Sequence, residues 1–79
     1  MMNIIREYEI IVKIYHDEPV ARIRYSVNGK TEESNLYSLG EINNLVKLWE
    51  CDELLGSFAI GTKLERGARC TLVNGGVIA

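Results

Sequence analysis

His16 is the single histidine of the 79-residue sequence, and it directly precedes two acids, Asp17 and Glu18. A histidine beside a carboxylate is the arrangement that general-base catalysis and metal binding use. However, adjacent residues of a strand point to opposite faces, and neither cysteine is close enough in sequence to complete a nucleophile or a ligand set. We therefore interpret His16 as a solvated residue at a strand end, and we predict no metal site and no cofactor.

Paired acids occur at Glu32-Glu33 and at Asp52-Glu53. Neighbouring side chains diverge on a strand or a helix, and the sequence indicates no cleft that would raise a carboxyl pKa for general acid or base catalysis. Gly61, Gly67, Gly75 and Gly76 sit at turn-like positions without a following helix whose N-terminus could bind a phosphate. These patterns favour solvated charges and turn glycines, so we predict that the protein is not an enzyme.

The two cysteines, Cys51 and Cys70, lie too far apart for a CxxC redox pair or a zinc knuckle. We expect both to be reduced, partly buried thiols. A single disulfide is the alternative.

A basic and aromatic patch is the one positive indication of nucleic-acid binding. Four residues share the outer face of the first two predicted strands: Lys13, Tyr15, Arg22 and Arg24. Glu9 lies on the same face, we expect Arg24 to pair with Glu33, and the net charge is -2. An ordinary charged sheet face is therefore the alternative interpretation.

A second candidate surface is the acidic end of the predicted helix, formed by Glu50, Asp52 and Glu53. Three carboxylates close together could contact a basic partner. A solvated helix end is the alternative.

Alternating apolar and polar residues predict strands over 8–16 and 20–27, separated by a short loop at Asp17-Glu18-Pro19. Asn28-Gly29 favours a two-residue hairpin turn, because both central residues of a type I′ turn need positive φ. Counting outward from this turn pairs Arg24 with Glu33 and Ala21 with Leu36. The polar third strand, over 30–37, is expected at the edge of the sheet.

Ser38 and Glu41 form a capping box, which predicts that a helix begins here and ends near 51–55. An apolar stripe at helical spacing should cover the sheet; its residues are Leu39, Ile42, Leu45, Val46 and Trp49.

The last third of the chain alternates over 57–64, turns at Arg66-Gly67 and continues over 70–73. A second Val-Asn-Gly, at 73–75, predicts another hairpin turn and a very short last strand over 76–79. The element order is then βββαβββ. We expect one α+β domain over 1–79, with a small antiparallel sheet of β-hairpins and one amphipathic helix packed on one face.

Composition limits the function classes. With 47% hydrophobic and 25% charged residues, the chain has the balance of an ordinary globular domain. No apolar run reaches the length of a membrane span, and the first residues lack the pattern of a signal peptide. We therefore expect a cytoplasmic protein that does not associate with a membrane.

Residues 20–49 are predicted to form a strand, the turn Val27-Asn28-Gly29-Lys30, a polar strand, the pair Tyr37-Ser38 and a helix that carries Leu and Trp. This layout resembles that of some small phage-encoded anti-CRISPR proteins. The resemblance implies a non-enzymatic inhibitor that occupies a site on a CRISPR-Cas effector.

Our leading prediction is a small protein-binding module that docks a sheet face, an edge strand or the helix end onto a larger protein. A phage-type inhibitor of a defence effector is its most specific form. The alternatives are a nucleic-acid-binding module and a homo-oligomer joined through the third or the C-terminal strand.

Overall fold

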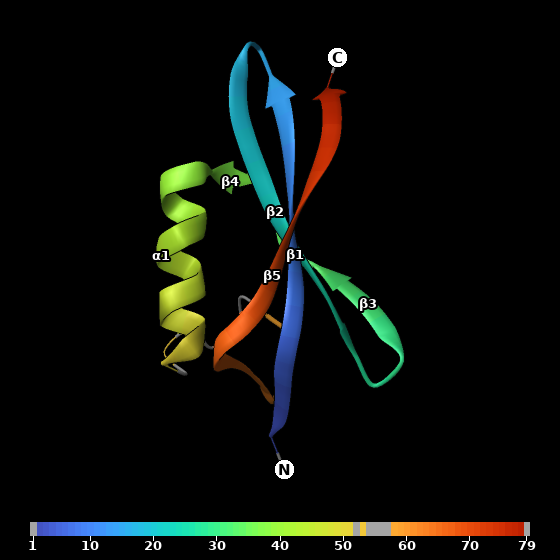
Figure 1. Cartoon of the computed structure of the whole chain (residues 1–79), viewed down its shortest axis with the longest axis vertical. Coiled ribbons are helices and arrows are strands. Elements are labelled where there is room, and N and C mark those ends of the chain that lie inside the picture. Colours follow the sequence, from blue (N-terminus) through green and yellow to red (C-terminus); the bar gives the residue numbers. More distant parts are fainter. Residues whose placement is uncertain (1, 52, 54–57, 79) are drawn as a thin grey trace.

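The computed structural model describes residues 2–51, 53 and 58–78. One helix packs on one face of a five-stranded sheet, so the predicted α+β fold is confirmed (Figure 1). The elements are β1 (Asn3–Tyr15), β2 (Glu18–Val27), β3 (Lys30–Glu33), β4 (Tyr37–Ser38), α1 (Leu39–Glu50) and β5 (Thr62–Ile78). The strand order is β3-β2-β1-β5, and the short β4 pairs with β2.

A tight turn, and not the predicted loop, joins β1 to β2. His16 and Asp17 take φ values of 48° and 64°, and the strands continue up to both sides of this turn, with Tyr15 opposite Glu18. Pro19 is therefore part of β2, opposite Ile14. Its position next to the start of the strand is one that a sheet tolerates.

The β2–β3 hairpin follows the predicted register. Asn28 and Gly29 have φ values of 51° and 77°, as a type I′ turn requires. Arg24 lies opposite Glu33 as expected, but Ala21 lies opposite Tyr37 and not Leu36. The extra residue is accommodated near Ser34, whose N–H donates to the Ile23 carbonyl at 2.9 Å and whose hydroxyl accepts from the Ile23 N–H at 2.9 Å.

Ser38 is the N-cap of α1, as predicted. The Ser38 hydroxyl accepts a hydrogen bond from the Glu41 N–H at 3.3 Å and donates to the Glu41 carboxylate at 3.2 Å. Ile42 and Trp49 are buried, whereas Leu39, at the start of the predicted apolar stripe, is exposed. The stripe thus covers the sheet from its second turn onward.

Aromatic rings form the centre of the core. Trp49 stacks on Phe58 with ring centroids 4.0 Å apart and planes inclined by 8°, and Tyr25 lies 4.9 Å from Trp49. The Tyr25 hydroxyl accepts a hydrogen bond from the Ala59 N–H at 2.7 Å. This contact ties the segment after the helix to the C-terminal part of β2.

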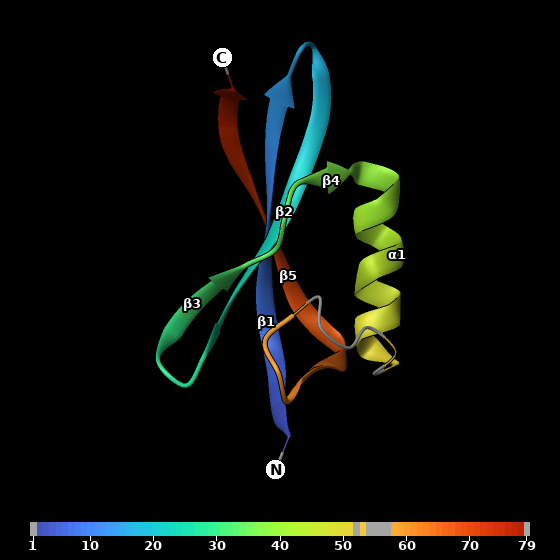
Figure 2. The same ribbon diagram turned by 180° about the vertical axis from the view of Figure 1, so that it is seen from behind.

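β5 differs most from expectation. The segments predicted as separate antiparallel strands form one strand of 17 residues, and it runs parallel to β1, so the sheet is mixed. The reason is visible in Figure 2: after α1 the chain returns to the start of β1, where the Asn3 N–H donates to the Gly61 carbonyl. From there β5 runs beside β1 in the same direction, and the pairing extends from Asn3 with Thr62 to Tyr15 with Ile78.

The predicted turns at Arg66-Gly67 and Asn74-Gly75 are both incorporated in β5. They coincide with two register shifts against β1, one between Ile5 and Glu7 and one between Val12 and Ile14. Extra residues in one strand produce such bulges. The second Val-Asn-Gly is therefore a bulge in a strand, and Ile78 still pairs with Tyr15.

Candidate binding surfaces

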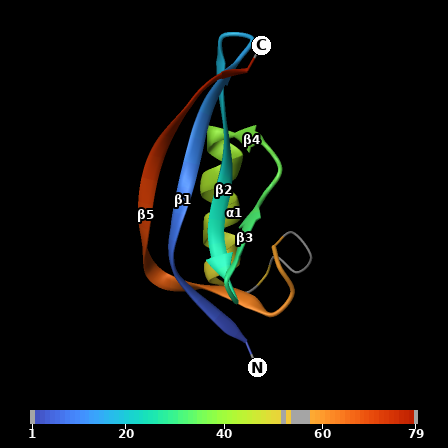
Figure 3. The same cartoon turned by 90° about the vertical axis from the view of Figure 1, so that its right-hand side faces the viewer.

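The residues of the predicted basic patch do lie on one face of the sheet. Arg24 is the register partner of Glu9, Arg22 of Ile11, and Lys13 of Val20. Because side chains alternate along a strand, these residues and Tyr15 face away from Ile10 and Ile23, which are core residues. Figure 3 shows that α1 covers one face only, so the patch belongs to the open face.

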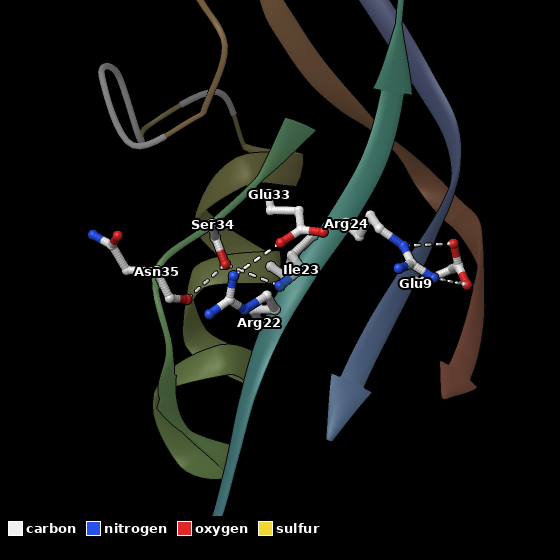
Figure 4. A network of polar contacts seen from close by, with 7 residues as sticks. All are labelled: Glu9, Arg22, Ile23, Arg24, Glu33, Ser34 and Asn35. Atoms are coloured by element: carbon white, nitrogen blue, oxygen red, sulfur yellow. Dashed lines mark hydrogen bonds and ion pairs between the residues drawn. The ribbon is translucent and has the colours of Figure 1, made fainter. Parts of the chain in front are cut away.

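Both arginines of this patch are held by carboxylates (Figure 4). Arg24 donates to both carboxylate oxygens of Glu9, at 3.1 and 3.0 Å, and Arg22 donates to Glu33 at 2.9 Å. The hydrogen bonds from Arg24 hold the pKa of Glu9 below its ordinary value, and Glu9 in turn raises the pKa of Arg24.

The predicted Arg24–Glu33 ion pair is therefore wrong, although the two residues are register partners. In a twisted antiparallel pair, a long side chain also reaches the diagonal neighbour two residues away. Arg22 is that diagonal neighbour of Glu33, and Arg24 instead turns toward Glu9 on the other side of β2. The arginines of the open face are therefore paired with glutamates and are not free positive charges.

A shallow hollow of about 510 Å³ lies on the same face. Its lining includes Glu9, Arg24, Ser26, Thr31, Glu33 and Thr71. Glu7 lines it too, so three glutamates and one arginine face the hollow and carboxylates outnumber positive charges there. The expectation that this face binds nucleic acid stays a prediction.

The acidic surface at the end of α1 is described only in part. Glu50 is the last helical residue and is half-buried, and Glu53 is exposed with its N–H donating to the Leu48 carbonyl at 2.9 Å. Asp52 lies outside the described residues. A role for this surface in binding stays a prediction.

The cysteines are free thiols, but both are exposed and not partly buried as expected. Cys70 lies on β5 beside Tyr8, where burial, with a further contribution from Cys70, raises the pKa of the Tyr8 hydroxyl to about 12. Within residues 2–51, 53 and 58–78, no group of three or more metal-ligating side chains comes together, and no helix is long and apolar enough to cross a membrane.

The outer edge of β5 is a longer surface than the very short C-terminal strand that the sequence predicted. Figure 3 shows β5 at one side of the sheet, and in the part of the chain that the structure describes no strand pairs with its outer edge. Leu72 and Val77 on this strand are 73% and 76% exposed. Reading this segment as a hairpin concealed a long edge strand.

Comparisons with known proteins found no match. No family model, no curated protein and no solved structure matches this chain.

Proposed function

We propose that this chain is a protein-binding module that adds an extended segment of another polypeptide to the outer edge of β5. The observation that carries the proposal is the segment Cys70–Asn74, which is regular in register, uncharged and exposed at Leu72. Strand addition uses main-chain hydrogen bonds for affinity and alternate side chains for specificity.

The two edges of the sheet differ in a way that supports this choice. β3 is four residues long, and three of its residues are charged: Lys30, Glu32 and Glu33. Short, charged edge strands are a common protection against pairing with another chain. The stretch from Cys70 to Ile78 on β5 carries no charged side chain, so this end of the opposite edge lacks that protection.

Side chains beside this edge also favour a partner of mixed or apolar character. Leu72 lies on the same face as its register partner Ile10, and Val77 on the same face as Ile14. A strand added along Cys70–Asn74 would place its own side chains against Leu72 and would remove its surface from water. Burial of apolar surface contributes about 25 cal/mol per Å².

The more specific prediction, a phage-type inhibitor of a CRISPR-Cas effector, stays a prediction. It is compatible with the proposed site, because a strand docked on an effector occupies a surface of that effector. The absence of enzymatic activity likewise stays a prediction.

Photo-crosslinking in the native cells tests the proposal. A benzophenone amino acid replaces Leu72 in one variant and Thr31, exposed on the opposite edge, in a matched control. We expect defined protein adducts from position 72 and none from position 31. Adducts from position 31 alone, or from neither position, would overturn the proposal.

A further inference from the structure

We infer that the occupant of the β5 edge is the same edge of a second copy of this chain, paired antiparallel about Leu72. The inference rests on the proposed function, because it names the partner of the same site. It is carried by the regularity of the edge, by its charge and by its symmetry.

The regular part of the edge is bounded by the two bulges of β5. Between them, Arg69–Asn74 pairs without interruption with Glu7–Val12. Over these six residues the N–H and C=O groups that point away from β1 are evenly spaced, which is what a neighbouring strand needs. After Asn74 the shift in register interrupts that spacing. The centre of the pairing segment must therefore lie before Asn74.

Charge makes this segment compatible with itself. Cys70, Thr71, Leu72, Val73 and Asn74 are all uncharged, so a second copy brings no like charge opposite another. On β3, self-pairing would gather Glu32 and Glu33 of two chains along one edge. Like charges directly opposite each other destabilise a strand pair.

Symmetry then selects the register. A two-fold axis perpendicular to the sheet at Leu72 places each residue before Leu72 opposite a residue of the second copy that lies the same number of positions after Leu72. Leu72 then faces the same residue of the second copy, Cys70 faces Asn74, and Thr71 faces Val73. This register covers the leucine that is 73% exposed in one chain, and it keeps both helices on the same face of one continuous sheet.

Sedimentation velocity over a range of concentrations tests the inference on the purified full chain. We expect a species of twice the chain mass, and we expect Leu72→Lys to weaken this association by at least about tenfold, because two ammonium groups would face each other. Thr31→Lys adds the same charge on the other edge and should leave the association unchanged. Urea unfolding of both variants checks that each is folded.

A disulfide trap tests the register. In a background with Cys51→Ser and Cys70→Ser, Leu72→Cys should form a covalent dimer with oxidised glutathione, because opposite residues of an antiparallel pair have Cα atoms about 4.5 to 5.5 Å apart. Thr71→Cys or Val73→Cys should crosslink far more slowly. Faster crosslinking at 71 or 73 would overturn the register about Leu72.

Failure of this inference is distinguishable from failure of the proposed function. A wild-type chain that stays a monomer at all concentrations overturns self-pairing. If position 72 still gives adducts with another protein in cells, the proposed function stands with a different partner. If it gives no adducts at all, both are overturned.

Discussion

Ile10 and Leu72 are register partners on neighbouring parallel strands, yet Ile10 is 8% exposed and Leu72 is 73% exposed. Both side chains lie on the face of the sheet that carries α1. Ile10 packs in the core with Ile42 and Trp49 of α1, whereas α1 does not cover Leu72. The apolar face of the sheet therefore reaches beyond its own helix at the β5 edge.

The turn between β1 and β2 should be improvable. His16 and Asp17 hold positive φ angles, which cost side-chain-bearing residues more than glycine. We expect His16→Asn with Asp17→Gly to raise the free energy of unfolding by about 1 kcal/mol. Urea denaturation measures it.

The reverse exchange at the second turn is the matched control. Asn28→His with Gly29→Asp should lower the free energy of unfolding, because φ there is 51° and 77°. An unchanged midpoint in both double variants would show that turn conformation does not limit stability.

Local patterns explain which parts of the fold could be predicted. Asn28-Gly29 and the pair Ser38 and Glu41 act within a few residues, so the second hairpin and the helix start were predictable. The direction of β5 depends on where α1 returns the chain, which no short pattern contains. β1 extends to Tyr15, and β5 pairs with it up to Ile78. This pairing forms more hydrogen bonds than the predicted hairpin could, because its last strand would have only the four residues 76–79.

The candidate surfaces were likewise predictable only where a local pattern determines them. Alternation alone predicted that Arg22 and Arg24 share a face, but their ion-pair partners depend on sheet twist and on which strand lies beside β2. Self-association through the C-terminal strand was among the alternatives, but the length of the β5 edge was not predicted, because the second Val-Asn-Gly indicated a turn there. The uncharged run from Cys70 to Ile78 was the available signal.

Removing the Glu9 carboxylate should destabilise the protein in a pH-dependent way. Because Arg24 lowers the pKa of Glu9 in the folded state, this stabilisation is present above the unfolded-state pKa of about 4.3 and is lost as pH falls through the lower folded value. We expect Glu9→Gln to unfold at lower urea than wild type at pH 7. The difference should shrink as the pH falls below 4.

Glu53→Gln removes the same charge at an exposed position outside the sheet and is the control. A Glu9→Gln difference that stays constant from pH 7 to acid would mean that the ion pair does not contribute to stability.

Two glycines should respond to alanine in opposite directions. Gly40 lies in the first turn of α1 with no atom within 4 Å of an added Cβ, so Gly40→Ala should raise the free energy of unfolding by about 0.5 to 1 kcal/mol. At Gly75 an added Cβ would lie 2.7 Å from Ile11 Cγ2 and 2.8 Å from Lys13 Cγ. Ile11 is buried, so Gly75→Ala should cost about 1 to 3 kcal/mol.

Thermal unfolding of the two alanine variants checks this pair. Equal shifts of the same sign would contradict the close approach of β5 to β1 at Gly75.

The hydroxyl of Tyr25 should be needed to hold the segment after the helix. In Tyr25→Phe the Ala59 N–H loses its acceptor, which should cost about 1 to 3 kcal/mol of unfolding free energy. Tyr15→Phe removes a hydroxyl from an exposed ring and should change stability by less than about 0.5 kcal/mol. Similar losses in both variants would contradict the role of this hydrogen bond.

Amide hydrogen exchange along β5 tests most directly whether this edge pairs with another strand. Followed by NMR at rising protein concentration, the amides of Cys70–Asn74 that point away from β1 should exchange more slowly as the edge becomes covered, while the exposed amides of β3 should not change. Exchange along Cys70–Asn74 that is independent of concentration, in a chain that remains monomeric, would contradict pairing of this edge with a second copy.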